Sequence, residues 1–279
     1  MIVQAPAKLN LTLEVGQKRP DGYHDLISVM SCAALYDTVT IEETGDGRIT
    51  LVCDDPALPC DGSNLAYRAA AVFFEGRNCP GVHIHLKKTI PMQAGLGGGS
   101  ADAAAVLRGL RKLYAPEMLM EELERLGAAL GSDVPFCVRG GTALCEGRGE
   151  RMTTLPDVPK CWVVIVKPPE AHPTGAMYGA IDRINPLRRH TTEQLTAALQ
   201  AGDLQKMTEN LYNTFEDVLP SDSEIPAIRQ ALLGSGALGA MMSGSGSAVF
   251  GVFADRQTAQ RAQETLQKRW EKTFLAESV

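Results

Sequence analysis

Apolar and polar residues alternate near the start of the chain, and the alternation predicts a strand over Ala7–Val15. Leucine and valine occupy one face of this strand, whereas the other face carries Lys8, Asn10, Thr12 and Glu14. Polar strand faces are usually solvated, which is one interpretation of these four side chains. The other interpretation is functional, since Lys8 and Asn10 would project side by side, roughly 7 Å apart, toward a phosphate or hydroxyl group.

Further along the chain, apolar residues recur every three or four positions and predict helices, while shorter apolar or alternating runs predict strands. The predicted helices cover Leu65–Glu75, Glu117–Leu130, Thr174–Ile181, Thr192–Leu199, Leu204–Leu211, Glu224–Leu233 and Arg256–Trp270. The predicted strands cover Val82–Lys87, Cys161–Val166 and Ala248–Phe253, and a loop is predicted over Asn185–Arg189. The proline-containing segment Leu155–Lys160 divides the chain into two predicted domains, 1–155 and 156–279.

A glycine-rich run follows the predicted strand Val82–Lys87 and precedes a further helical pattern. Four of the five residues from Gly95 to Gly99 are glycine. Glycine permits unusual backbone dihedrals and lets N–H groups approach a ligand closely. A glycine loop that opens a helix also directs unpaired N–H groups and the helix dipole toward one point. The run therefore predicts a phosphate-binding loop, with the Ser100 hydroxyl placed to meet a phosphate or its metal ion.

The common phosphate motifs do not match this run. A Walker A loop needs a lysine before its serine, whereas Ser100 directly follows Gly99. A dinucleotide fingerprint needs a third glycine where Ser100 stands and an acidic residue about 20 positions further on. A plain glycine-rich turn before a helix is the alternative interpretation.

Composition narrows the function classes. The 279 residues, 44% of them apolar and 22% charged, are typical of a globular protein of about two domains. A net charge of −6 argues against broad nucleic-acid binding. We expect no secretory signal, because Gln4, Pro6 and Lys8 interrupt any apolar run near the N-terminus. We expect no membrane span, because no apolar stretch reaches the ~18 residues that a span needs. Reduced thiols in a cytoplasmic protein are expected from seven scattered cysteines without a Cys-x-x-Cys pair: Cys32, Cys53, Cys60, Cys79, Cys137, Cys145 and Cys161.

Two shorter stretches carry residues with candidate chemistry. Tyr23 and His24 follow a Pro-Asp-Gly turn. They would either stack on a base and read its edge, or be an ordinary packed tyrosine beside a surface histidine. Asp133 follows a glycine and a serine, where it either caps a helix or accepts a proton from a hydroxyl group.

Two other patterns leave their interpretation open. The second glycine-serine run, Met242–Ser247, is either a hairpin turn or a second wall of one ligand site. His83 and His85 share a strand face. Because base rates favour exposed histidines over metal ligands, a solvent-facing pair is favoured over a metal site.

These motifs together resemble the GHMP superfamily, named after galactokinase, homoserine kinase, mevalonate kinase and phosphomevalonate kinase. The resemblance rests on Pro91-Met92-x-x-Gly95-Leu96-Gly97-Gly98-Gly99-Ser100 and on Met242-Ser243-Gly244-Ser245-Gly246. Three further stretches, Ala5–Leu11, Arg19–His24 and Gly131–Phe136, are similar to the branch that phosphorylates 4-diphosphocytidyl-2-C-methyl-D-erythritol. The five motifs occur in the order of that branch and extend from Ala5 to Phe250.

The resemblance implies that ATP phosphorylates the 2-hydroxyl of this substrate, giving the 2-phosphate and ADP in non-mevalonate isoprenoid biosynthesis. It implies that Asp133 is the general base and that Lys8 is its partner near the moving phosphoryl group. Mg2+ is expected on the phosphates, with Ser100 as the candidate protein ligand. The ATP phosphates would lie on the loop made of Pro91, Met92, Gln93, Ala94, Gly95, Leu96, Gly97, Gly98, Gly99, Ser100 and Ala101.

For the acceptor, the resemblance implies a hydrogen bond from Asn10 and a cytosine held between Tyr23 and Tyr178. His24 would read the cytosine edge, and Thr174 would lie near the same pocket. Members of this branch commonly carry phenylalanine at the position of Tyr178, so an aromatic ring that can stack on the base is present in either case. The sequence departs from the branch at Gln93 and Ala94, where many relatives carry another glycine, and this departure puts the first turn of the loop in doubt.

The implied fold is α+β, with an N-terminal domain like ribosomal protein S5 domain 2 and a ferredoxin-like C-terminal domain. The implied partner is a small molecule carrying a cytidine diphosphate group, with no nucleic acid and no membrane, and the chain would be a monomer or homodimer. Two other functions stay open: a GHMP kinase acting on mevalonate, phosphomevalonate or homoserine, and a non-catalytic nucleotide-binding regulator. Tyr23, His24 and Tyr178 argue against the first, and the retention of Lys8 and Asp133 argues against the second.

Overall fold

The structure, a computed structural model, describes residues 1–78, 80–184 and 190–279. Cys79 and the loop predicted over 185–189 lie outside the described residues. The chain forms two compact units, each assembled from separated stretches. The first unit comprises Met1–Lys8, Tyr36–Met92 and Gly97–Gly140, and the second comprises Leu9–Leu35, Gln93–Leu96 and Gly141–Val279. Because these units are not contiguous halves of the chain, the boundary between sequence domains at 155/156 stays a prediction.

The first unit contains a mixed sheet. Strand β5 (Val82–Lys87) pairs antiparallel with the second half of β3 (His24–Glu43) and parallel with β4 (Ile49–Cys53). Strand β1 (Ile2–Asn10) also pairs with β3. The strand predicted over Val82–Lys87 is thereby confirmed as β5.

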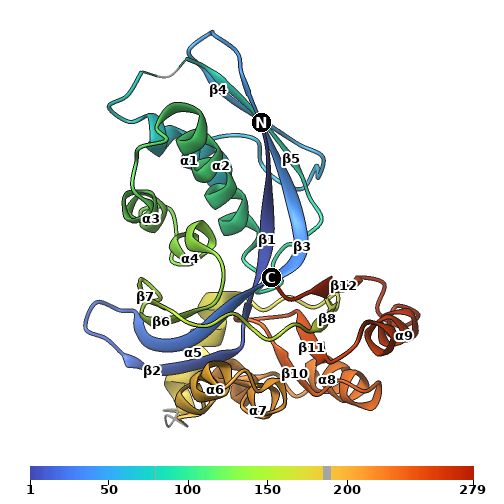
Figure 1. Cartoon of the computed structure of the whole chain (residues 1–279). Helices are drawn as coiled ribbons and strands as arrows, with labels where there is room; N and C mark the ends of the chain where they lie inside the picture. Colours follow the sequence, from blue (N-terminus) through green and yellow to red (C-terminus); the bar gives the residue numbers. More distant parts are fainter. Residues whose placement is uncertain (79, 185–189) are drawn as a thin grey trace. The chain divides into compact units, whose positions relative to one another are not determined.

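Four helices belong to the first unit, and α1 and α2 lie beside β1 and β3 (Figure 1). Gly109 lets α2 pack closely on the sheet, because a Cβ atom there would lie 2.5 Å from Ile41 Cδ1 and 3.2 Å from Val3 Cγ2. The alanines of α2 are buried as well. Because these side chains are small, the helix that follows the glycine run packs close to the sheet. The helices are α1 (Leu65–Phe74), α2 (Gly98–Tyr114), α3 (Met120–Ala128) and α4 (Val134–Arg139).

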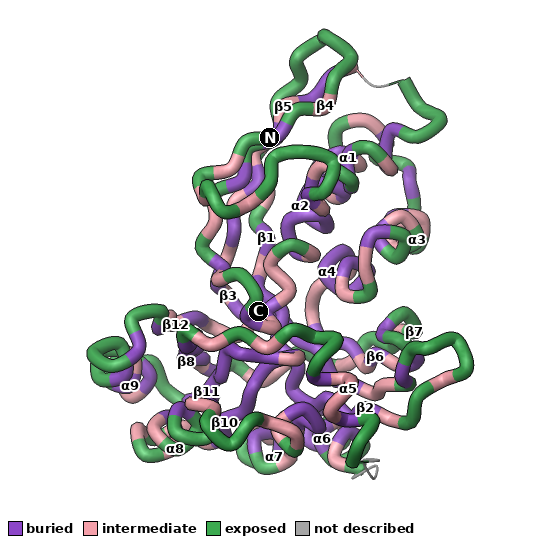
Figure 2. Tube along the Cα trace, turned by 180° about the vertical axis from the view of Figure 1, so that it is seen from behind, coloured by how far each residue is buried: buried purple, intermediate pink, exposed green. Residues whose placement is uncertain are grey.

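The second unit contains an antiparallel four-stranded sheet in the order β10-β11-β8-β12. Its central strands β8 and β11 are apolar and almost wholly buried, as Figure 2 shows. The predicted strands Cys161–Val166 and Ala248–Phe253 are thereby confirmed. The strands of the sheet are β8 (Trp162–Val166), β10 (Gly239–Met242), β11 (Val249–Phe253) and β12 (Thr273–Glu277).

Helices and a second group of strands complete this unit. The helices are α5 (Thr174–Ile184), α6 (Thr191–Gln200), α7 (Leu204–Glu209), α8 (Ile225–Gly234) and α9 (Arg256–Leu266), with a short 3-10 helix at Thr214–Val218. They correspond to the five helices predicted from periodicity, with differences of a few residues at their ends. The other strands are β2 (Thr12–Lys18), the first half of β3, β6 (Ala143–Gly147), β7 (Arg151–Thr154) and β9 (Tyr212–Asn213). Helices with mostly antiparallel strands agree with the predicted α+β class.

The N-terminal strand prediction needs two corrections. The region forms two strands, β1 and β2, which are interrupted at Leu11. The solvated interpretation of its polar face is also wrong, because Lys8, Asn10, Thr12 and Glu14 are all buried. Hydrogen bonds offset the desolvation cost of burying these polar side chains. Within the second unit, Thr12 Oγ1 accepts from the N–H of Val29, and Glu14 Oε1 accepts from the N–H of Thr192.

No helix among residues 1–78, 80–184 and 190–279 is long and apolar enough to cross a bilayer.

Candidate functional site

The glycine run opens helix α2 in the first unit, as predicted. Gly97 is the residue before the helix and has φ = 66°, a left-handed conformation that strongly favours glycine. A Cβ atom on Gly97 would lie 2.7 Å from Lys8 Cγ. Gly97 is therefore required both by its dihedral angle and by the lysine stem that passes it. The first N–H groups of α2 have no partner within the helix, so they and the helix dipole favour an anion at this end.

Lys8 and Asp133 form an ion pair within the first unit, with Lys8 Nζ 3.5 Å from Asp133 Oδ2. They are 125 positions apart in the sequence, so their contact is a product of the fold. The Lys8 side chain is 5% exposed, whereas that of Asp133 is 34% exposed. Asp133 begins α4, but its side chain makes no capping hydrogen bond there. The carboxylate is thus held by a buried ammonium group and stays accessible to a hydroxyl group, as a general base must be.

The second glycine-serine run is a hairpin turn, and it also packs against part of the first run. Strands β10 and β11 pair up to Met242 and Val249, so the run joins their ends. Within the second unit, Ser243 Oγ donates to the Gly95 carbonyl oxygen at 3.0 Å, and the Ala248 N–H donates to the Ala94 carbonyl oxygen at 3.0 Å. Of the two interpretations, the hairpin is confirmed and the wall of a ligand site stays a prediction.

Gln93 and Ala94, the residues that depart from the family pattern, directly precede Gly95. Gln93 has φ = 51°, so it adopts the left-handed conformation that a glycine would take easily. Ala94 is buried. At Gly95 the requirement for glycine is strict, because a Cβ atom would lie 2.0 Å from the Ser243 carbonyl oxygen and φ is 74°.

Asn10 is buried and belongs to the same hydrogen-bonded group of the second unit. Its Nδ2 donates to Ser28 Oγ at 2.8 Å, and its backbone N–H donates to Ser243 Oγ at 3.3 Å. Ser243 thus links Asn10 to Gly95 through one hydroxyl group. Asn213 supports the same hairpin, because its Nδ2 donates to the carbonyl oxygens of Met242 and Gly244, each at 2.8 Å.

His24 and Tyr178 come together in the second unit. Their rings stack with centroids 4.9 Å apart and an interplanar angle of 22°. His24 Nε2 lies 2.8 Å from Asp182 Oδ1, and Lys18 Nζ lies 3.2 Å from Asp182 Oδ2. Hydrogen bonds from His24 and then from Lys18 hold the pKa of the Asp182 carboxyl below its ordinary value. His24 is buried, so the interpretation as a surface histidine is wrong.

Tyr23 lies apart from this stack. It is 54% exposed, and the Arg148 guanidinium carbon lies 4.8 Å from the centroid of its ring. Thr174 begins α5, and its Oγ1 lies 2.9 Å from Ser245 Oγ in the hairpin turn. Helix α5 therefore carries both Thr174 and Tyr178 and connects the aromatic stack to the glycine-serine turn.

The sequence interpretation did not identify Asp182, Arg148 or Ser243 as individual contributors. Asp182 lies four positions after Tyr178 and eight after Thr174, so helical spacing places the three on one side of α5. That spacing was the available signal. Arg148 lies in the glycine-flanked turn between β6 and β7, and no periodicity marks it.

The described residues suggest how ATP and a metal ion would be held. Gly99 offers open space beside the start of α2, since a Cβ atom there would meet only Leu65 within 4 Å, at 3.6 Å. Such a glycine-lined helix N-terminus fits a phosphate chain. Among residues 1–78, 80–184 and 190–279, no group of three or more His, Cys, Asp or Glu side chains is arranged to hold a metal ion. A magnesium ion would therefore take most of its ligands from phosphate oxygens and water, with the Ser100 hydroxyl as a candidate ligand.

Comparison with known proteins gives consistent matches over the whole chain. The family described as GHMP kinases N terminal domain matches residues 64–141, and that described as GHMP kinases C terminal matches residues 195–272. The chain is 41% identical to 4-diphosphocytidyl-2-C-methyl-D-erythritol kinase of Caldicellulosiruptor saccharolyticus, covering 100% of this chain and 95% of the relative. It is 43% identical to the enzyme of the same name from Exiguobacterium sibiricum, covering 94% and 92%.

Solved structures give the same picture. A crystal structure of 4-(cytidine 5'-diphospho)-2C-methyl-D-erythritol kinase matches with a TM-score of 0.83 and 35% identity, covering 100% of this chain and 99% of the other. Homoserine kinase from Cytophaga hutchinsonii matches with a TM-score of 0.78 and 18% identity, covering 100% and 94%, which shows a shared fold.

Proposed function

The chain belongs to the GHMP kinase family, in its 4-diphosphocytidyl-2-C-methyl-D-erythritol kinase branch, and from this premise we propose how its side chains carry out the reaction. The enzyme is an ATP-dependent kinase that phosphorylates the 2-hydroxyl of 4-diphosphocytidyl-2-C-methyl-D-erythritol and releases ADP. The reaction belongs to non-mevalonate isoprenoid precursor biosynthesis. The observation that carries the residue assignments is the ion pair of Lys8 and Asp133, which lies beside the glycine that opens α2.

The glycine-rich loop holds the phosphates of ATP. The N–H groups at the start of α2 donate to phosphate oxygens, and the helix dipole adds favourable potential there. Ser100 lies in the first turn of α2, where its hydroxyl would hold Mg2+. The bound metal ion supplies neutralisation of negative charge on the β- and γ-phosphate oxygens.

Asp133 acts as the general base. Its carboxylate accepts the proton of the 2-hydroxyl as that oxygen forms a bond to the γ-phosphorus, and the bond from the γ-phosphorus to the bridging oxygen of ADP breaks. Lys8 Nζ holds Asp133 and offers positive charge to the phosphoryl group in transit. Because Gly97 makes room for the lysine stem, the loop and the catalytic ammonium group are positioned together.

His24, Tyr23 and Tyr178 recognise the cytosine. In the tautomer with hydrogen on Nε2, His24 donates a hydrogen bond to the Asp182 carboxylate, and its Nδ1 is then an acceptor suited to the cytosine amino group. His24 stacks on Tyr178, and Phe215 packs against the same ring with centroids 5.0 Å apart and an interplanar angle of 83°, so the exposed ring of Tyr23 offers the second stacking surface for a base. Stacking of this kind contributes ~1–3 kcal/mol per contact. Asn10 hydrogen-bonds the acceptor, and Thr174 contacts the same ligand.

The cytoplasmic location expected from the scattered cysteines, and the choice between monomer and homodimer, stay predictions.

ADP release with ATP and Mg2+ tests the assignment. The rate with 4-diphosphocytidyl-2-C-methyl-D-erythritol is compared with the rate with 2-C-methyl-D-erythritol 4-phosphate, which lacks the cytidine group. We expect release with the first acceptor and at least a hundredfold lower kcat/KM with the second. Equal kcat/KM for both acceptors would remove the role given to His24 and the tyrosines, and release with neither would remove the proposed reaction.

A further inference from the structure

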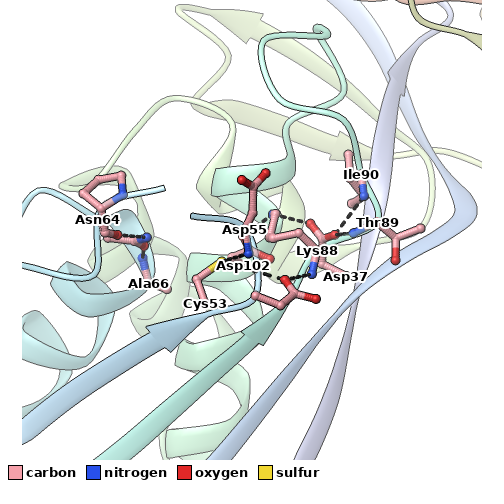
Figure 3. Close-up of polar contacts among 11 residues, drawn as sticks. Asp37, Cys53, Asp55, Asn64, Ala66, Lys88, Thr89, Ile90 and Asp102 are labelled. Carbon is pink, nitrogen blue, oxygen red and sulfur yellow. Dashed lines mark hydrogen bonds and ion pairs between the residues drawn. The ribbon is translucent and has the colours of Figure 1, made fainter. Parts of the chain in front are cut away.

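The two flanks of the phosphate loop carry a buried charge cluster that the proposed mechanism does not use. Asp37 lies on β3, Lys88 directly follows β5, and Asp102 lies in α2. Lys88 Nζ donates to Asp37 Oδ2 and, at 2.5 Å, to Asp102 Oδ2 (Figure 3). The side chains of Asp37, Lys88 and Asp102 are 0%, 7% and 4% exposed. All three belong to the first unit.

Asp37 also fixes the backbone that leads into the loop. Its Oδ1 accepts the N–H groups of Thr89, at 2.5 Å, and Ile90, at 2.8 Å, as Figure 3 shows. The backbone N–H of Lys88 donates to Asp54 Oδ1 at 2.9 Å. Three consecutive N–H groups before Pro91 are therefore bound to carboxylates, so the entrance to the loop has little freedom.

Lys88 connects this entrance to the exit of the loop. Asp102 follows Ser100 by two residues, in the first turns of α2, and the ammonium group of Lys88 binds it. The same segment packs against the helix start, because a Cβ atom on Gly98 would lie 3.2 Å from Ile90 Cγ2 and 3.6 Å from Lys88 Nζ. One ammonium group thus ties the residues before the loop to the helix after it.

Stability alone does not explain this arrangement. Burying three charged groups costs desolvation free energy, and well-packed apolar residues commonly replace a buried ion pair without loss of stability. The cluster has one ammonium group for two carboxylates. Asp102 Oδ1 has no hydrogen-bond partner in the described part of the chain. Unlike an apolar contact, the hydrogen bonds of Lys88 fix the direction in which the two carboxylates are held. This fixed direction, more than a gain in stability, distinguishes the cluster.

We propose that Asp37, Lys88 and Asp102 form a clamp that positions the phosphate loop for ATP. Lys88 is a positioning residue in this account: its ammonium group is bound to both carboxylates and does not contact the phosphates. The clamp sets the direction of the first N–H groups of α2 relative to the entrance of the loop. It rests on the proposed function, which places the ATP phosphates at this helix N-terminus.

The test compares Asp102→Asn, Asp102→Ala and a control, Lys87→Met. Asn keeps the shape of Asp102 and an oxygen that accepts from Lys88, whereas Ala removes the connection. Lys87 is an exposed lysine next to Lys88, so its loss reports the general effect of removing a positive charge. For each variant, the Kd of ATP is measured by calorimetry, and kcat and both KM values are measured from ADP release.

We expect Asp102→Ala to raise the Kd and KM of ATP about tenfold, and Asp102→Asn to raise them about threefold. The KM of the acceptor should stay within twofold of wild type in both Asp102 variants. For Lys87→Met, the Kd of ATP, kcat and both KM values should stay within twofold of wild type. If Asp102→Ala fails to fold, the isosteric Asp102→Asn decides alone.

Two results would overturn the clamp. If the Asp102 variants lose stability in urea while their Kd for ATP equals that of wild type, the cluster is only structural. If Lys88→Met weakens ATP binding while Asp102→Asn leaves it unchanged or tightens it, Lys88 contacts ATP directly. Because calorimetry needs no turnover, a wild-type protein that binds ATP but phosphorylates no acceptor would contradict the proposed function and leave the clamp testable.

Discussion

Two loops of similar composition serve different purposes in this chain. The first loop, Gly95–Ser100, leads into a helix, and the second, Ser243–Ser247, joins two strands. In the first loop, a Cβ atom on Gly99 would have open space on most sides. In the second, a Cβ atom on Gly246 would lie 2.6 Å from Met242 Sδ. Glycine therefore has two purposes in the first loop, where Gly95 and Gly97 permit tight packing and Gly99 leaves room for a ligand, whereas Gly246 in the second loop permits tight packing.

The two loops also differ in what holds them. The flanks of the first are connected by charged groups, in the clamp of Asp37, Lys88 and Asp102. The second is held by the neutral amide of Asn213 and by the carboxyl group of Glu216, which accepts from the Met242 N–H at 2.6 Å. Composition identifies a turn, but the element that follows the turn decides whether its N–H groups can converge on an anion.

The largest expected effect is on folding, at the contact between the loops. Gly95→Ala places a methyl group 2.0 Å from the Ser243 carbonyl oxygen at φ = 74°. Overpacking and the left-handed backbone together should reduce the free energy of unfolding by about 3 kcal/mol or more. Urea denaturation measures this loss. Gly234→Ala is the control, since a Cβ atom there meets nothing within 4 Å. Equal stability of the two variants would show that the contact between Gly95 and Ser243 does not require glycine.

Gly97→Ala should act mainly on catalysis. The new methyl group would meet Lys8 Cγ at 2.7 Å, and the flexible lysine side chain would shift to relieve the contact. A misplaced Lys8 should lower kcat about 10²-fold, because small displacements of catalytic groups have effects of that size. Steady-state ADP release measures the change, with Gly62→Ala as the control. An unchanged kcat would show that the position of Lys8 does not depend on Gly97.

Ser243→Ala should have a smaller effect, on stability. The buried hydroxyl group accepts from the Asn10 N–H and donates to the Gly95 carbonyl oxygen, and both would lose a partner. Leaving buried polar groups unsatisfied costs about 1–3 kcal/mol. Ser245→Ala, in the same loop, removes only a contact with Thr174 and should change the urea midpoint less. If the order of the two variants is reversed, Ser243 is not the link between the loops.

The smallest effect concerns pH and the second loop. Burial raises the pKa of Glu216 above its ordinary value of 4.5. The folded protein therefore binds a proton that the unfolded chain has released. The stability contributed by this group falls as pH rises from about 4.5 through the raised folded-state pKa, and is constant above it.

Glu216→Gln keeps an oxygen acceptor for the Met242 N–H and removes the titration. As pH rises over that window, the urea midpoint of wild type should therefore fall relative to the midpoint of Glu216→Gln. A difference that is independent of pH would show that Glu216 does not titrate abnormally.

Local patterns predicted the elements that local interactions determine. Helix α2 and the loop before it follow from a glycine run and a periodic apolar stripe, and both were predicted. Asp255 is likewise a local feature: it caps α9, and its side chain accepts from the Thr258 N–H at 2.9 Å. Neither feature depends on residues distant in the sequence.

The polar groups of the site depend on distant residues, and here prediction from the residues alone failed. The polar face of the first strand was expected to be solvated because its partners, such as Thr192 for Glu14, lie more than 170 positions away. The surface interpretation of His24 stayed open because its partner Asp182 lies 158 positions away. Lys8 and Asp133 were paired only by resemblance to a family, since a separation of 125 positions hides the contact from any local pattern.

The central claim is that Asp133 accepts the proton of the acceptor hydroxyl group while the glycine loop binds ATP independently. The most direct test measures kcat from ADP release, and the Kd of ATP by calorimetry, for wild type and Asp133→Ala. The account predicts a loss in kcat of roughly 10²–10⁴-fold with the Kd of ATP within about twofold of wild type. A near wild-type kcat for Asp133→Ala would contradict it.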